Sequence, residues 1–276
     1  MLHLYLSPHL DDAVLSCGGT IAAQVAAGEP VRVVTLFAGD PSPGPLSPFA
    51  VELHWRWGLD EAPGAGRRAE DERALNLLGA TAVHLPFPDA IYRAGPDGVP
   101  LYPSREAIFG PPHPVEAGLV DELAHALAAL NLPSQVRIYG PLGVGQHVDH
   151  VLTRRAAERW QPRGGEFWYY EEYPYAESPD QVIAALGQGA WREQLVLLTP
   201  AHLEAKLVAI ACYISQISSL FADLTDMRER VRAHAARLAQ GQGPAPSLHS
   251  ELALSATKGQ ALSHAKAYAE RFYQIG

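Results

Sequence analysis

The fold is indicated first by residues 2–28, which read LHLYLSPHLDDAVLSCGGTIAAQVAAG. Residues 2–7 form a short apolar run that predicts a strand starting almost at the first residue. Residues 12–27 are rich in alanine and predict a helix that ends at Gly28, a residue common just after the last helical turn. A strand that passes directly into a helix is the first unit of an α/β fold.

The same alternation continues along the chain. Further strands are predicted over 31–38, 82–87, 135–142 and 166–173, and helices over 67–78, 115–130, 148–160, 202–239 and 252–274. This pattern predicts an α/β fold with a Rossmann-like, mostly parallel sheet flanked by helices. We expect one domain over 1–276, with a core of about 2–221 and a helical C-terminal extension of about 222–276.

Three stretches rich in proline and glycine interrupt the alternation, at 39–66, 93–114 and 241–247. Loops of this length in a compact domain usually form binding walls or lids, or are disordered. The first two follow predicted strands, and ligands of open α/β sheets bind beyond the carboxyl ends of the strands. We therefore expect them to wall the site, with plain surface loops as the alternative. We expect Trp55 and Trp57 in the first stretch either to stack on a ring of the ligand or to be buried under the loop.

The composition is that of a folded protein. The 276 residues contain 21 basic and 30 acidic side chains, for a net charge of −9, and 47% hydrophobic residues. The acidic balance argues against nucleic acid or an anionic membrane as a partner. No apolar stretch reaches 18 residues, so no transmembrane segment is expected, and no signal peptide is recognised. Two cysteines make no disulfide framework and fit a cytoplasmic location. A homo-oligomer stays open.

Two groups of chemically active side chains follow predicted strands. His9, Asp11 and Asp12 follow the first strand, where the aspartates alone would also serve as a helix N-cap. His147 and His150 stand at the start of the helix after the 135–142 strand. If these strands lie close in the sheet, His9, one aspartate and His150 form a His₂-carboxylate set. That is the ligand class of catalytic zinc, and it also suits ferrous iron.

These motifs resemble the LmbE-like/PIG-L family of zinc-dependent de-N-acetylases. The likeness rests on six segments in order: Pro8-His9-x-Asp11-Asp12, Cys17-Gly18-Gly19-Thr20-Ile21, Arg67-x-x-Glu70, Phe87-Pro88-Asp89, His147-x-Asp149-His150 and Lys206 to Gln216. One position departs from the family pattern, because Ala13 stands where an acidic residue usually follows the aspartate pair.

The resemblance implies a role for each matching residue. His9, Asp12 and His150 would bind Zn²⁺, with Fe²⁺ as the other suitable metal. Asp11 would act as general base towards a water that the metal activates, and His147, as imidazolium, would donate to the oxyanion. Arg67 and Asp89 would hold sugar hydroxyls, unless they form an ordinary ion pair.

The implied reaction is removal of an N-acetyl group from an N-acetylglucosamine-type glycoconjugate or biosynthetic intermediate. The alternatives are hydrolysis of a different amide, or a non-catalytic sugar-binding protein that keeps the metal motif.

Overall fold

The computed structural model describes residues 1–59, 62–160, 165–241 and 267–276. In these residues seven strands form one sheet in the order β3-β2-β1-β4-β5-β7-β6. The strands are β1 (Leu2–Ser7), β2 (Val31–Thr35), β3 (Thr81–His84), β4 (Val136–Pro141), β5 (Glu166–Tyr170), β6 (Trp191–Leu198) and β7 (Tyr268–Ile275). Strands β1 to β5 all pair in parallel, whereas β7 is antiparallel to both β5 and β6. The predicted α/β fold with a mostly parallel sheet is confirmed.

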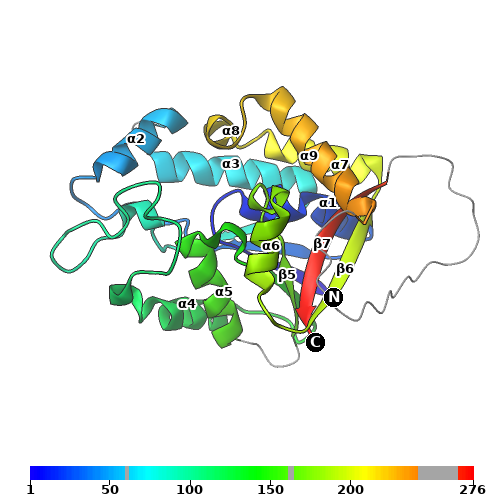
Figure 1. Cartoon of the computed structure of the whole chain (residues 1–276), viewed down its shortest axis with the longest axis horizontal. Coiled ribbons are helices and arrows are strands. Elements are labelled where there is room, and N and C mark those ends of the chain that lie inside the picture. Colours follow the sequence, from blue (N-terminus) through cyan, green and yellow to red (C-terminus); the bar gives the residue numbers. More distant parts are fainter. Residues whose placement is uncertain (60–61, 161–164, 242–266) are drawn as a thin grey trace, which may run out of the picture.

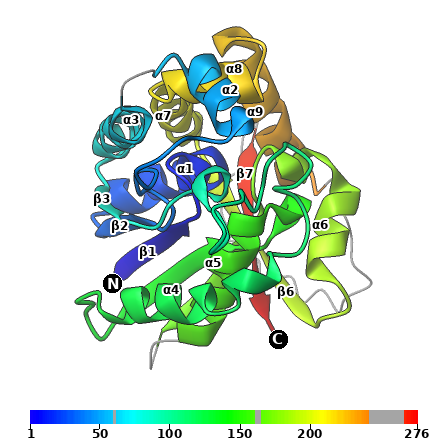
Figure 2. The same ribbon diagram turned by 90° about the vertical axis from the view of Figure 1, so that its left-hand side faces the viewer.

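Helices cover both faces of the sheet (Figure 1). They are α1 (Asp12–Ala26), α2 (Pro48–Trp57), α3 (Pro63–Leu78), α4 (Leu119–Ala128), α5 (Val148–Trp160), α6 (Pro179–Leu186), α7 (Pro200–Ile210), α8 (Ile214–Leu220) and α9 (Leu224–Ala239). Helices α1, α3, α7 and α9 pack on one face, and α4 and α5 pack on the other (Figure 2). All six residues of β1 are buried, as expected for a parallel strand covered on both faces.

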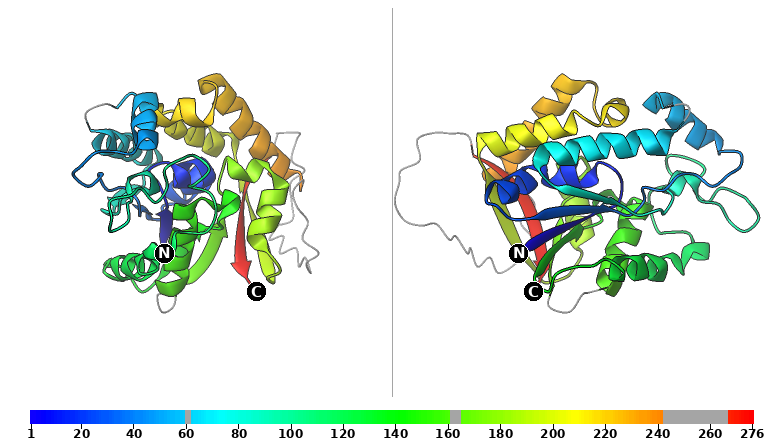
Figure 3. Two further views of the ribbon diagram at one scale, coloured as in Figure 1. Left: turned by 60° about the vertical axis from the view of Figure 1, so that its left-hand side comes forward. Right: turned by 180° about the vertical axis from the view of Figure 1, so that it is seen from behind.

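The strand order reverses beside β1. The chain moves outward from β1 to β2 and β3, then returns to place β4 on the other side of β1. Ligands of open α/β sheets bind at such a reversal, beyond the carboxyl ends of the strands. The two histidine-bearing segments follow β1 and β4, so the topology brings them to this point (Figure 3).

The first proline-rich stretch contains a helix that the sequence analysis did not predict. Pro48 is the first residue of α2, and the Ser47 side chain accepts a hydrogen bond of 3.1 Å from the Ala50 amide. Proline is well tolerated in the first helical turn, because its missing N–H has no partner there. Here Pro48 therefore marks a helix start, although the surrounding prolines suggested a loop.

The C-terminal helix prediction is wrong where the structure describes it. Residues 268–275 form β7, which lies between β5 and β6, rather than the end of a helix over 252–274. Residues 242–266 lie outside the described residues. They include all of the predicted loop 241–247 except its first residue. The helical character expected of 222–276 holds for α9. Charged residues made the β7 segment resemble a helix, but Glu270 is buried against Lys206 at 2.7 Å.

No single helix in the described part of the chain has the length and apolarity needed to cross a membrane. Helices α7 and α8 have the necessary length and apolar composition only when they are taken together, and the chain bends by 100° between them.

Candidate active site

The turn after β1 holds His9 and Asp12 in place. The Ser7 hydroxyl donates to the His9 carbonyl at 2.7 Å and accepts from the Ala13 amide at 3.0 Å. The Asp12 carboxylate accepts from the His9 amide at 2.8 Å. Asp12 is the first residue of α1, and no side-chain hydrogen bond caps the start of this helix. The Asp12 carboxylate instead holds the turn that carries His9 and stays beside the His9 ring.

The three predicted metal ligands meet in space. One oxygen of Asp12, Oδ2, lies 3.2 Å from His9 Nδ1 and 3.2 Å from His150 Nε2. All three side chains are buried. Two imidazole nitrogens facing one carboxylate oxygen make a donor set suited to zinc or ferrous iron.

His147 lies beside this set. Its ring centroid is 4.8 Å from that of His9 and 5.2 Å from that of His150. Nitrogen atoms of the three histidines lie within 4.8 Å of one another, so they form a second possible donor group. Burial, together with the nearby His9 and His150, lowers the pKa of His147 well below its usual value. Without a metal these surroundings favour a neutral His147 ring rather than an imidazolium.

Buried carboxylates hold the far sides of both ligand histidines. His9 Nε2 lies 2.9 Å from Asp149 Oδ2, and His150 Nδ1 lies 3.2 Å from Glu172 Oε1. Such contacts fix the tautomer and orientation of metal-binding histidines. The sequence analysis quoted Asp149 within a motif without giving it a role, and it missed Glu172. Glu172 follows β5, far along the chain, and only the pairing of β4 with β5 brings it close.

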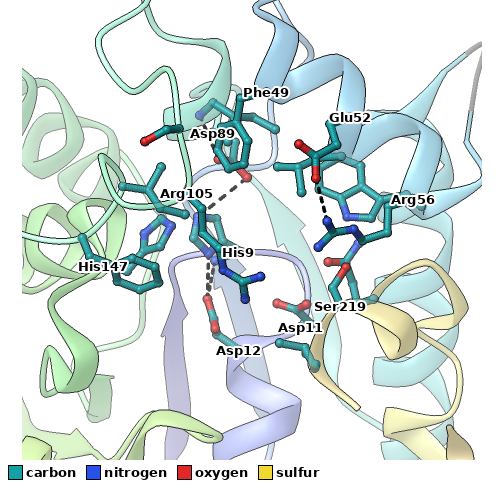
Figure 4. A pocket seen from close by; sticks show the side chains of 18 of the residues that line it. His9, Asp11, Asp12, Phe49, Glu52, Arg56, Asp89, Arg105, His147 and Ser219 are labelled. Atoms are coloured by element: carbon teal, nitrogen blue, oxygen red, sulfur yellow. Dashed lines mark hydrogen bonds and ion pairs between the residues drawn. The ribbon is translucent and has the colours of Figure 1, made fainter. Parts of the chain in front are cut away.

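Asp11 lies on the cavity floor next to Asp12, and its carboxylate points into the cavity (Figure 4). Burial and the neighbouring Asp12 charge raise the pKa of Asp11 to about 7, although Arg67 and His9 oppose the shift. A carboxylate that titrates near neutral pH is suited to accepting and returning a proton.

Arg67 and Asp89 also lie on the floor, next to each other. Arg67 Nη1 is 3.5 Å from Asp89 Oδ2, which is itself 3.8 Å from His9 Nε2. The Arg67 guanidinium lies 4.7 Å from the centre of the Trp57 ring. Arg67 Nε is buried without a hydrogen-bond partner among the described residues. The two residues therefore form an ion pair that lines the cavity.

The charges at the site favour a cation. Burial lowers the pKa of His9, but Asp89, Asp12 and Asp149 together raise it well above its usual value. The same kind of balance raises the pKa of His150 to about 9, with Asp12 as the main opposing charge to burial. Carboxylates that draw protons onto both rings would equally stabilise a divalent cation between them. The donor set and its electrostatics thus fit a metal ion.

These residues form the floor of a cavity of about 530 Å³. Its walls come from α2, the segment 103–109, residues 173–175 and α8 (Figure 4). Trp57, one of the two tryptophans singled out in the sequence, lines this cavity and is buried, whereas Trp55 is 79% exposed and lies outside it.

An open α/β sheet with two histidines and an aspartate pair at its strand reversal defines an α/β protein with a candidate metal centre. Residues 4–161 match the family model described as PIG-L: GlcNAc-PI de-N-acetylase. The chain belongs to this family, and its activity is that of a de-N-acetylase, a hydrolase of linear amides. The match includes every residue given a role in the sequence analysis.

Curated relatives are named deacetylases. The chain is 31% identical over 236 residues to a 2'-N-acetylparomamine deacetylase of Niallia circulans, covering 80% of this chain and 82% of the relative. It is 32% identical over 174 residues to a 1D-myo-inositol 2-acetamido-2-deoxy-alpha-D-glucopyranoside deacetylase of Mycobacterium sp. (strain KMS). That match covers 60% of this chain and 53% of the relative.

Solved structures of deacetylases share the fold. The zinc-inhibited form of teicoplanin deacetylase Orf2 superposes with a TM-score of 0.80 at 29% identity, covering 100% of this chain and 99% of that chain. The A40926 pseudoaglycone deacetylase Dbv21 gives a TM-score of 0.70 at 30% identity, covering 99% and 96%. Both similarities extend over β7 and the helices beyond the family match.

Proposed function

We propose that this enzyme removes the acetyl group from an N-acetylglucosamine-type glycoconjugate or biosynthetic intermediate, with Zn²⁺ as its metal. The relatives' named substrates, N-acetylparomamine and an acetamido-glucopyranoside of inositol, support this substrate class. The His₂-carboxylate donor set supports the metal, and the same donors suit Fe²⁺.

In this proposal His9, Asp12 and His150 hold the metal. A divalent cation at this position supplies Lewis-acid polarisation of the amide carbonyl and of a water molecule. Asp149 and Glu172 keep the two imidazole rings oriented towards the shared Asp12 oxygen. This leaves Asp11 beside the donor set as a base that does not have to serve as a ligand.

Asp11 would accept the proton of the attacking water. As the C–N bond breaks, the leaving amine would take up a proton from Asp11 or from His147. A general base works best with a pKa near the operating pH, which burial beside Asp12 provides. His147 would donate its ring N–H to the oxyanion of the tetrahedral intermediate. Arg67 and Asp89 would hold sugar hydroxyls, because they meet at the cavity floor and both line the cavity.

The observation that carries the proposal is the convergence of His9, Asp12 and His150 on one oxygen, beside Asp11. The test combines metal analysis of the purified protein with release of free amine from N-acetylglucosamine, its methyl glycoside and 2'-N-acetylparomamine. We expect one metal ion per chain and release from at least one substrate. Asp11→Asn should lower kcat by about 10²–10⁴-fold, the usual contribution of a general base.

Asp180→Asn is the matched control, because Asp180 is exposed on α6 and lies outside the cavity. It should leave the rate unchanged. Stoichiometric metal without amine release from any substrate, or an Asp11→Asn rate equal to that of the control, would contradict the proposed function.

We further infer that 1–276 acts as one unit in a cytoplasmic setting. Residues of β7 join the sheet that carries the site, and Cys17 and Cys212 are both free thiols. Thiol titration after purification under oxidising conditions checks the second point, with two reactive thiols expected in the denatured chain.

A further inference from the structure

The cavity extends well beyond the catalytic floor. Its volume of about 530 Å³ lies within the range of roughly 300–1,000 Å³ that holds drug-sized ligands. A single acetamido sugar held by Arg67 and Asp89 would occupy only the inner part. The outer part is bounded by α2 on one side and by the segment 103–109 on the other (Figure 4). The side chains that line this outer part would therefore contact the group to which the sugar is attached.

One wall is an apolar stripe on α2. Phe49, Leu53 and Trp57 are spaced four residues apart, so they share one face of the helix, and all three line the cavity. Val51 and Trp55 lie outside the cavity lining and are 53% and 79% exposed. The helix thus directs its apolar stripe at the cavity while leaving these two side chains in solvent.

The facing wall is apolar as well. Ile108 and Phe109 line it from the segment 103–109. The Phe109 ring lies 6.0 Å from Tyr175 and 5.6 Å from His147, edge-on in both cases. An aromatic or alkyl group placed between Phe109 and Leu53 would be in contact with apolar side chains on both sides.

The charges in this outer part balance. Glu52 and Arg56 form an ion pair of 2.7 Å, and Arg105 stands beside Glu106 in the opposite wall. Two acidic and two basic side chains leave no net charge to select an ionic group. A strongly cationic or anionic substituent would gain no net Coulombic attraction from them, whereas an apolar one would gain from burial.

We propose that α2 and the segment 103–109 form a subsite for an uncharged aromatic or alkyl aglycone attached to the N-acetylated sugar. This inference rests on the proposed deacetylase function and specifies its substrate class. The aglycone would bind between Leu53 and Phe109 while the acetamide reaches the catalytic floor.

The test compares the methyl and phenyl glycosides of N-acetylglucosamine with the metal-loaded enzyme. We expect kcat/KM to be about 10- to 100-fold larger for the phenyl glycoside, because its ring buries apolar surface that the methyl group lacks. Leu53→Ser and Phe109→Ser, one on each wall, should each bring the phenyl-to-methyl ratio towards one. Val51→Ser is the matched control on the same helix and should keep the wild-type ratio.

The outcomes separate the two proposals. Equal kcat/KM for the two glycosides in the wild-type enzyme overturns the subsite and leaves the deacetylase function standing. Failure to deacetylate either one counts against the proposed function. The subsite is then judged by calorimetry with phenyl and methyl glucosides, which carry no acetamide. Tighter binding of the phenyl compound, lost in both wall variants, supports the subsite, and equal binding overturns it.

Discussion

On the side away from Asp12, the ring of each proposed ligand histidine contacts a buried carboxylate. Asp149 contacts His9, and Glu172 contacts His150 while also accepting from the amides of Leu142, Gly143 and Val144. Three amide donors keep Glu172 in place whether or not the site holds a metal. The histidine rings are therefore already oriented before a cation arrives, which reduces the entropy lost on binding.

At the residue scale, His9, Asp12 and His150 compete as a donor set with the three histidines and with His9, Asp89 and Asp149. The effects of substitutions on zinc-dependent stability distinguish the Asp12 set from the three histidines. If His9, Asp12 and His150 bind the metal, Asp12→Asn should abolish the rise in thermal midpoint that added Zn²⁺ produces, because the ligand that lies between both rings loses its charge. His147→Gln should keep that rise. Ligand binding to the native state alone raises stability by about 2.7 kcal/mol at 100 times Kd.

Differential scanning calorimetry with and without Zn²⁺ measures both variants. Ala13→Ser is the control for non-specific damage to the turn. Ala13 is buried next to the proposed ligands, and its side chain cannot bind a metal. A lost zinc response in His147→Gln with a retained response in Asp12→Asn would assign the metal to the three histidines instead.

Among single residues, the sequence singled out the proposed ligands His9, Asp12 and His150 but not the carboxylates that hold their rings. The histidine and aspartate motifs place metal-binding residue types directly after predicted strands, so they can be recognised without a structure. Glu172 is an ordinary glutamate in an aromatic strand end, and nothing near it in the sequence signals its contact with His150. Its role depends on a strand pairing.

At the scale of elements, the segment after β3 is tied to the metal site by a buried ionic network. Arg93 Nη1 donates to Asp149 Oδ1 at 2.6 Å, and its Nε donates to Glu116 Oε1 at 2.5 Å. The Tyr102 hydroxyl also donates to Glu116. The residues that lead into the 103–109 wall therefore share one network with the carboxylate behind His9.

This connection predicts a metal-binding defect at a residue that is not itself a ligand. Arg93→Met should weaken Zn²⁺ binding by about 10–100-fold, the usual effect of losing a partner behind a metal ligand. Arg93→Lys should restore part of the affinity because it returns the charge without the two-pronged geometry. Competition with a chromogenic chelator measures Kd directly.

Arg159→Met is the control, since Arg159 makes an ion pair with Asp121 at the surface. Glu116→Gln perturbs the same network more mildly and covers the case in which Arg93→Met does not fold. Wild-type affinity in folded Arg93→Met, or in Glu116→Gln if the former is insoluble, would show that Asp149 needs no support from Arg93.

Two of the elements that the sequence analysis missed, α2 and β7, share a physical cause. Helix α2 begins at a proline within a proline-rich stretch, and β7 carries a glutamate and an arginine that are buried only because partners from distant segments neutralise them. The paired glycines after Cys17 have a similar explanation. A Cβ on Gly19 would lie 2.4 Å from Leu198, where α1 passes over the β6–β7 part of the sheet. Close contacts between segments far apart in the chain cannot be predicted from the pattern of neighbouring residues.

For the whole molecule, packing of α9 sets a pH dependence of stability. Burial and the neighbouring cations Lys206, Arg237 and Arg271 lower the pKa of His234 to about 3. The neutral ring lies 2.9 Å from the Arg237 guanidinium and can accept a hydrogen bond from it. Below a pH of about 6.5 the unfolded chain protonates this histidine while the native protein does not, so native stability falls as pH falls.

Between pH 6.5 and 5, His234 should cost the wild-type protein roughly 1–2 kcal/mol of unfolding free energy. His234→Gln, which keeps an acceptor for Arg237, should lack this component, so its stability curve falls less over the same range. Urea unfolding at a series of pH values measures the difference. His125→Gln, at an exposed position of α4, should follow the wild-type curve, and parallel curves for His234→Gln and wild type would contradict the prediction.

The place of β7 in the sheet has a consequence for synthesis of the chain. Its two neighbours, β5 and β6, come earlier in the sequence, and about a hundred residues separate the end of β5 from the start of β7. At roughly 5–20 residues per second, the ribosome needs about 5–20 s to make that stretch. Throughout this interval the exposed edge of β5 lacks its partner strand and offers unpaired amides and carbonyls to other chains. Nascent chains of this enzyme should therefore depend on chaperones until β7 emerges.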